Sequence, residues 1–360
     1  MCKQGRKALL LAGLLLPLSS GALLAQQYYQ DPYQGAQAQV AAPAADVGIL
    51  SALLRAQVAR AQAGAVWRRF APERRALVSE GSPWLAGGGR GARISPVSGQ
   101  GAGGSGWSLW LEGAPQHMRN TSTALRGKGY ALGQTLGLDR RLGERTTVGL
   151  NLGFTHTSVK TSYNSGREKN DAWLLGLYMS HQLAPWLSLD VQGGYVHQRQ
   201  KLRRVFAGTA FSGRRSSNGY QLSGALNAWR WVGRQVMVSG RLGLIATRDH
   251  WKGYTESGGG LSMARPARTQ ALVQGVAEAG VSLWLEPVMP YARVGYTRDL
   301  YRKNMQASSS DRDDFTLFGG LQWFGSGAAD GLSLDLGGSV VLGRAHRRHV
   351  AGSLGVRWAW

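Results

Sequence analysis

Four acidic residues are the groups in this sequence that could supply paired carboxylates for acid–base hydrolysis. They lie far apart, each in a stretch where polar and apolar residues alternate, at Asp139, Asp190, Glu278 and Asp335. This alternation places all four on the polar side of separate strands. We expect them to be solvated charges inside a pore, opposite the basic residues Arg241, Arg293 and Arg357.

The sequence gives even less support for a catalytic nucleophile or a metal site. The sequence contains no Gly-x-Ser-x-Gly motif, the turn that presents the catalytic serine of α/β-hydrolases. His346 and His349 have the spacing of helical metal ligands, but the pattern predicts a turn there, and the arginines between them repel a cation. We therefore predict no metal site, no cofactor and no catalysis.

The elements that carry these residues are predicted to be strands, as the C-terminal stretch illustrates. Leu354, Val356, Trp358 and Trp360 share one parity, while the residues between them are small or charged. A period of two indicates a β-strand. Large apolar side chains on one face, with Gly, Ser and Arg on the other, are typical of a barrel with lipid outside and a polar lumen.

The same alternation recurs through the last two-thirds of the chain and predicts an all-β fold, a 12-stranded antiparallel transmembrane barrel. The predicted strands are Ser105–Gly113, Tyr130–Arg141, Thr146–Thr157, Ala172–Gln182, Leu187–Arg199, Gly219–Arg230, Gln235–Arg248, Thr269–Leu285, Met289–Asp299, Asp314–Phe324, Gly331–Gly343 and His349–Trp360. Tight turns alternate with long polar loops, which span 114–129, 158–171, 200–218, 250–268 and 300–313. Bacterial outer-membrane barrels have this arrangement. A soluble β-sandwich also alternates, but it buries large apolar residues.

The N-terminus predicts export. Lys3, Arg6 and Lys7 precede an apolar run and a group of small residues, which together form a secretory signal peptide over 1–25. The only cysteine, Cys2, lies within it, so the mature chain is predicted to have no thiol.

Three further segments are predicted before the barrel domain. They are a disordered stretch over 26–45, a helical segment over 46–80 and a Gly/Ser-rich linker over 81–104, followed by the barrel over 105–360. Leu50, Leu53, Leu54 and Val58 recur at helical spacing. This helix either lies on a surface or is threaded through the pore.

The net charge of +22, from 42 Lys and Arg against 20 Asp and Glu, is of the kind usually associated with nucleic acid. A signal peptide and a barrel argue against that partner. Guanidinium groups pair well with phosphates, so contacts with lipopolysaccharide explain the charge better, with a solvated basic loop as the equal alternative. The candidate contacts are Arg199, Lys201, Arg203, Arg204, Arg214, Arg215, Arg344, Arg347 and Arg348.

Several stretches between Ser105 and Trp360 resemble the β-domain of bacterial autotransporters, the translocator of type V secretion. They are Gly129–Gly143 with its Asp-Arg-Arg-Leu turn, Thr147–Thr155, Trp173–Ser180, Gly253–Gly260 with its Glu-Ser-Gly loop, Val294–Arg298 and Gly355–Trp360. The resemblance implies a 12-stranded outer-membrane barrel inserted by the barrel-assembly machinery with periplasmic chaperones. The terminal strand would be the insertion signal, and a helix in the pore would lead to an exported passenger.

We therefore predict a monomeric autotransporter-type translocator in the outer membrane of a Gram-negative bacterium, in contact with the lipid bilayer. Its passenger would be very short, because family members usually carry several hundred residues and only 26–45, or 26–106 at most, is available here. Two alternatives stay open. One is a stand-alone pore or structural barrel plugged by the helix, and the other is a surface adhesin or hydrolase that uses the long loops.

Overall fold

The computed structural model describes residues 106–121, 126–143, 145–162, 165–206, 208–304, 312–325, 331–342 and 347–360. These residues form fourteen strands. The strands are β1 (Trp107–Asn120), β2 (Gly127–Leu142), β3 (Thr146–Thr161), β4 (Arg167–Ala184), β5 (Leu187–Phe206), β6 (Thr209–Val232), β7 (Val236–Trp251), β8 (Tyr254–Gly258), β9 (Leu261–Arg265), β10 (Arg268–Leu283), β11 (Val288–Lys303), β12 (Asp313–Phe324), β13 (Leu332–Leu342) and β14 (Arg347–Ala359). The described part of the chain holds no helix of the length and apolarity that crossing a membrane requires.

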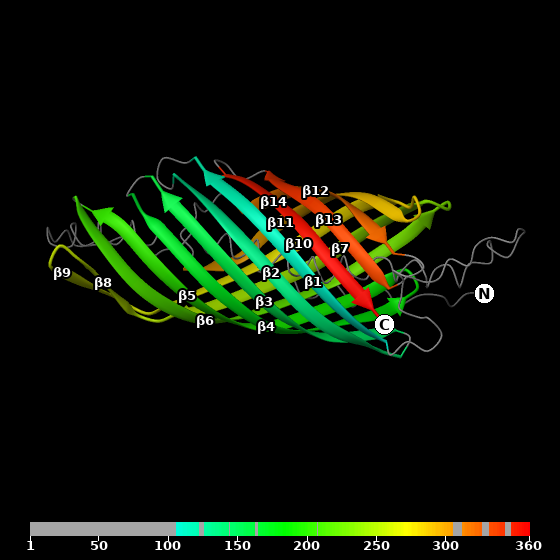
Figure 1. Cartoon of the computed structure of the whole chain (residues 1–360), viewed down its shortest axis with the longest axis horizontal. Coiled ribbons are helices and arrows are strands. Elements are labelled where there is room, and N and C mark those ends of the chain that lie inside the picture. The colour runs from blue at the N-terminus through cyan, green and yellow to red at the C-terminus, as the bar shows by residue number, and fades with distance from the viewer. Residues whose placement is uncertain are drawn as a thin grey trace, which may run out of the picture. The chain divides into compact units, whose positions relative to one another are not determined.

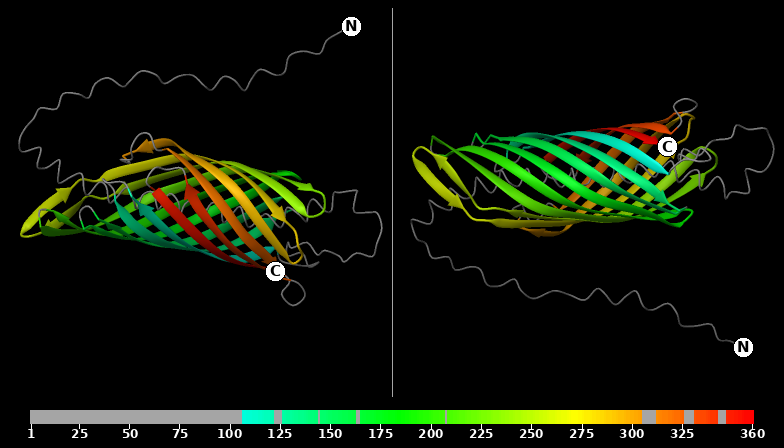
Figure 2. Two further views of the ribbon diagram at one scale, coloured as in Figure 1. Left: turned by 90° about the horizontal axis from the view of Figure 1, so that it is seen from above. Right: turned by 60° about the horizontal axis from the view of Figure 1, so that its bottom comes forward.

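Every strand except β8 and β9 belongs to one closed antiparallel barrel (Figure 1). Strands that follow one another pair, β7 pairs with β10, and β1 pairs with β14 to close the wall. The turned views show the same wall from two further sides (Figure 2). β8 and β9 form a hairpin attached to β6. The predicted 12-stranded antiparallel barrel is thus confirmed.

The barrel wall is apolar outside and polar inside. In β3, Leu150 and Leu152 are 53% and 60% exposed, whereas Asn151 between them is 2% exposed. β2 alternates in the same way from end to end. A soluble domain would bury the leucines, so this inverted pattern indicates a wall whose outer face contacts lipid.

Short turns join the strands at one end of the barrel. Gly143 and Gly233 lie in two of these turns with φ of 68° and 70°, a left-handed conformation that glycine adopts without a steric penalty. Only two residues, Pro185 and Trp186, separate β4 from β5. The C-terminal Trp360 follows β14 at this same end, next to Trp107. In outer-membrane barrels the short turns face the periplasm.

The structure corrects the prediction of long loops. β1 continues to Asn120, β3 continues to Thr161, and β5 and β6 remain paired as far as Phe206 and Thr209. The predicted loop over 250–268 contains the β8–β9 hairpin. Beyond the lipid level water wets both faces of a strand, so the apolar alternation ends there while the backbone hydrogen bonds continue.

Residues 1–105 lie outside the described ranges. The predicted signal peptide, disordered segment, helix and linker all fall there. The helical residues Leu50, Leu53, Leu54 and Val58 therefore stay a prediction.

Candidate functional site: the polar lumen

Asp139 is the centre of the first group of polar residues in the lumen. Its carboxylate accepts hydrogen bonds from Ser108 Oγ at 2.7 Å and from the Tyr178 hydroxyl at 2.6 Å, and Trp110 Nε1 donates to that hydroxyl at 2.8 Å. These four residues come from β1, β2 and β4, and all are buried. The network links neighbouring strands across the inner face of the wall, and its carboxylate is held by neutral donors.

Asp190 is held in a similar way on β5. Ser180 Oγ of β4 donates to Asp190 Oδ1 at 2.6 Å, and Asn227 Nδ2 of β6 donates to Asp190 Oδ2 at 2.8 Å. The side chain of Asn227 is fully buried. A carboxylate with two directed donors is fixed in position, so its negative charge stays at one place on the lumen wall.

A third carboxylate, Asp335 of β13, lies on the opposite part of the wall. Gln322 Nε2 donates to Asp335 Oδ2 at 2.9 Å, and the Tyr291 hydroxyl donates to Oδ1 at 3.4 Å. The Arg293 guanidinium lies over the Tyr291 ring, 4.5 Å from its centroid. Arg357 of β14, on the inward parity, faces Ser333 in register. This part of the lumen therefore brings together charges of both signs.

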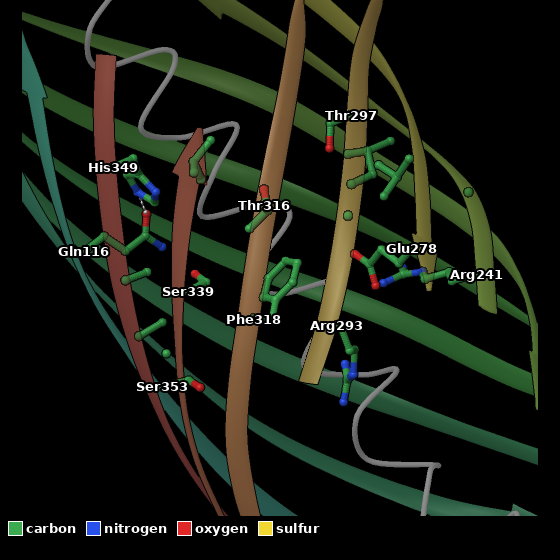
Figure 3. Close-up of a pocket in the computed structure, with 18 of the residues that line it drawn as sticks. Gln116, Arg241, Glu278, Arg293, Thr297, Thr316, Phe318, Ser339, His349 and Ser353 are labelled. Atoms are coloured by element: carbon green, nitrogen blue, oxygen red, sulfur yellow. Dashed lines mark hydrogen bonds between the residues drawn. The ribbon is translucent and has the colours of Figure 1, made fainter. Parts of the chain in front are cut away.

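Arg241 and Glu278 form the remaining pair of predicted lumen charges. They stand directly opposite each other in the β7–β10 register, and Figure 3 shows their side chains pointing toward one another. They line a pocket in the lumen, together with Arg293. Across the pocket, His349 Nε2 lies 3.2 Å from Gln116 Oε1 (Figure 3). The pocket is thus lined by fixed polar and charged groups that a polar chain could contact.

The predicted insertion signal lies on the opposite, outer face of β14. Leu354, Val356, Trp358 and Trp360 are 37–56% exposed and share one parity. The rings of Trp358 and Trp360 lie 5.3 Å apart between centroids. The predicted signal therefore forms one continuous apolar stripe on the strand that closes the barrel.

The predicted basic contacts differ in their exposure. Exposed on the outer surface are Arg199, Lys201, Arg203, Arg214 and Arg348. Arg344 and the side chain of Arg347 lie outside the described part. Arg215 is half-buried, with its guanidinium 4.3 Å from the centroid of the Trp251 ring.

Arg204 departs from the predicted surface contact. It is 4% exposed, and its Nη2 lies 2.6 Å from Glu256 Oε2 of β8. Glu256 also binds Arg265 Nη2 at 3.1 Å and accepts a hydrogen bond from the Tyr254 hydroxyl at 2.8 Å. Burial alone would raise the pKa of the Glu256 carboxyl, but hydrogen bonds from Arg204 and Tyr254 and the two arginine charges hold that pKa below its ordinary value. Arg204 therefore holds the hairpin rather than a surface ligand.

The alternation of polar and apolar residues does not single out Trp110, Tyr178 or Glu256 as site residues. Trp110 and Tyr178 are 68 residues apart, and only the barrel register brings them into contact. Trp110 and Tyr178 are large aromatic residues on the inward parity of their strands, and this parity is a signal that could predict the hydrogen-bond network around Asp139. Glu256 belongs to the Glu-Ser-Gly stretch that resembles the family motif, but a segment predicted to be a loop offers no basis for expecting a buried ion pair there.

A closed antiparallel barrel with an apolar outer face and a polar, charged lumen defines the class of outer-membrane β-barrels. The sequence matches the model of the autotransporter β-domain over residues 109–353. The chain belongs to the autotransporter β-domain family, as the motifs predicted, and the barrel is an autotransporter translocator domain.

Solved structures agree with this fold. The chain is similar to the translocator domain of autotransporter NalP from Neisseria meningitidis, with 18% identity and a TM-score of 0.62 over 72% of this chain and 90% of that one. It is also similar to the β-domain of the Bordetella autotransporter BrkA, with 18% identity and a TM-score of 0.59 over 71% of this chain and 100% of that one. Comparison with curated proteins gave no match.

Proposed function

We propose that this barrel resides in the outer membrane of a Gram-negative bacterium and exports or displays a very short N-terminal segment of its own, residues 26–45, without catalysis. One observation carries the proposal. The lumen is lined by fixed polar and charged side chains, including Asp139, Asp190 and the Arg241–Glu278 pair, whereas the outer wall is apolar. The family supports the class of function, and the polar lining of the lumen supports passage of a polar chain.

The predicted helix over 46–80 suits that path. Its arginines include Arg55, Arg60 and Arg68, and the lumen wall holds carboxylates at which such cations gain favourable electrostatic energy. A helix also satisfies its own backbone hydrogen bonds, so a polar pore admits it without exposing unpaired peptide groups. We propose that the helix occupies the lumen and that 26–45 lies beyond it at the cell surface.

An epitope tag placed after Ala25 tests export directly. We expect antibody to label the tag on intact cells as strongly as on lysed cells. A tag between Gly259 and Gly260, in the β8–β9 turn, is the surface control. A tag between Gly233 and Arg234, in a short turn, is the periplasmic control and should be labelled only after lysis. If the tag after Ala25 behaves like this second control, display is wrong, and a stand-alone barrel with an internal plug replaces it.

A further inference from the structure

The outer surface of the barrel carries a row of cations at the end away from the short turns. Six exposed basic residues, one on each of six neighbouring strands from β14 through β1 to β5, make up this basic band. They are Arg348, Arg119, Lys128, Lys160, Arg167 and Arg203. Four of the six, on β1 to β4, are not among the lipopolysaccharide contacts that the sequence predicts. They are Arg119, Lys128, Lys160 and Arg167.

The basic band is continuous in register. Arg348 stands opposite Arg119, which stands opposite Lys128. Lys128 stands opposite Lys160, Lys160 opposite Arg167, and Arg167 opposite Arg203. Directly opposed residues in antiparallel strands have Cβ atoms about 5 Å apart, and like charges at that distance destabilise the sheet. Five such contacts in succession form a surface at which a bound anion would relieve the repulsion.

A shorter second row of opposed cations lies beside the basic band. Lys169 stands opposite Lys201, and Lys201 stands opposite Arg214 on β6. This row lies on the same outer face, two residues nearer to the middle of β4 and β5. The one carboxylate at its edge, Asp171, lies 2.6 Å from His156 Nδ1 and stands opposite Arg199. Acidic side chains of the described wall therefore leave both rows without matching negative charge.

The pairs of directly opposed Lys and Arg residues all occur on one side of the described barrel. In the described pairings from β6–β7 round to β13–β14, no two Lys or Arg residues stand opposite each other. Exposed basic residues exist there, such as Arg248 and Lys303, but they stand opposite Tyr220 and Ala271. Net positive charge alone does not explain this arrangement, because it would not place the cations in register.

The level of the basic band follows from the aromatic residues beside it. Tyr130 on β2 and Trp173 on β4 are exposed, as are Tyr195 and Tyr220, whose ring centroids lie 5.7 Å apart. Aromatic side chains of this kind mark the boundary between acyl chains and headgroups. Lys128 lies two residues beyond Tyr130 on the same outer face of β2. Lys128, with Arg119 and Lys160 opposite it in register, therefore lies just beyond the aromatic boundary, where headgroup phosphates lie.

We propose that the basic band binds the phosphate groups of a phosphorylated glycolipid, lipopolysaccharide, in the outer leaflet. This inference rests on the outer-membrane orientation in the proposed function. A headgroup with two phosphates can contact more cations of the row at once than a phospholipid with one phosphate. Guanidinium and ammonium groups both pair with phosphate, and both types occur in the row. One side of the barrel would thus hold a fixed row of glycolipid.

Binding of fluorescent lipopolysaccharide to the full mature chain, refolded in zwitterionic micelles, tests the proposal. The band variant is Lys128→Gln/Lys160→Gln/Arg167→Gln, and the charge-matched control is Arg248→Gln/Lys252→Gln/Lys303→Gln. We expect the band variant to lose at least about tenfold in affinity, the size of one or two lost charge-assisted contacts. The control should stay within about twofold of the unaltered protein, since it leaves the row intact.

Equal losses in the two variants would overturn the proposal, because they would show a response to net charge alone. Dephosphorylated glycolipid should bind both variants and the unaltered protein equally weakly. Micelles containing phosphatidylglycerol should compete poorly, and full competition would overturn the assignment to a glycolipid. Heat-modifiable migration confirms that each variant is folded. The binding signal does not report where the N-terminal segment lies, so a negative result here leaves the proposed export standing.

Discussion

Gly137 and Gly149 leave the space that two large rings occupy on the lumen wall. Trp110 stands opposite Gly137 and Tyr178 stands opposite Gly149 in register, and a Cβ on either glycine would overlap the ring beside it. The rings also form the Trp110–Tyr178–Asp139 hydrogen-bond network. Small residues are required here by contact rather than by backbone conformation.

Gly137→Ala is therefore expected to destabilise the barrel by about 1–3 kcal/mol, the usual cost of overpacking. The added methyl group would displace the Trp110 ring and break its bond to Tyr178. The temperature at which the heat-modifiable folded band disappears measures the effect. Gly113→Ala is the matched control, because nothing lies within 4 Å of its added Cβ. A similar drop for both variants would show that the ring contact is unimportant.

The β8–β9 hairpin depends on a small number of contacts. Its register pairs with β6 are Ser212 with Ser257 and Gly213 with Glu256. Glu256 supplies the buried carboxylate that binds Arg204 and Arg265. Removing one partner of a buried pair leaves the other charge uncompensated, which is strongly destabilising. The Arg204–Glu256 ion pair is thus a main attachment of the hairpin to the barrel, while the Arg265–Glu256 pair joins β9 to β8 within the hairpin.

The attachment should depend on pH in one direction. The pKa of the Glu256 carboxyl lies below its ordinary value. The stabilisation that this carboxylate gives the hairpin is therefore fully present when the pH is above the ordinary pKa, and it is lost as the pH falls through the lowered pKa. We expect amide exchange in β8 and β9, corrected for intrinsic rates, to be unchanged between pH 7 and 5 and to accelerate well below pH 4.5. In Glu256→Gln the exchange should already be fast at pH 7. In Glu286→Gln, at an exposed turn, the exchange should match the unaltered protein.

How far the sequence predicts these elements depends on the environment of each strand. The lipid-facing strands are recognisable because lipid outside and polar groups inside impose a period of two, as in Leu150, Asn151 and Leu152. The outer ends of β5 and β6 are not recognisable, because water on both faces removes the contrast between them. The Trp110–Tyr178 contact and the basic band both depend on register between strands, which local pattern does not contain.

Closure brings the first and last strands of the barrel together. β14 pairs with both β1 and β13, and the Trp360 amide donates a hydrogen bond to the Trp107 carbonyl at 3.1 Å. Without β14 both neighbours would have unpaired edges within lipid, which the bilayer does not tolerate. The stripe ending in Trp360 faces outward, where the barrel-assembly machinery could contact it before closure. We propose that this stripe is read during insertion.

Trp360→Ala separates this role from stability. The substitution keeps the backbone bond to Trp107 and removes only the exposed ring, so we expect normal refolding in detergent but little heat-modifiable barrel in the outer membrane of cells. Trp186→Ala removes an exposed ring from a short turn at the same rim and should assemble normally. Deletion of residues 349–360 should abolish folding in both settings, because it removes most of β14. Normal amounts of the Trp360→Ala barrel in the outer membrane would rule out recognition of the terminal side chain, whereas failed refolding in detergent would assign the ring to stability.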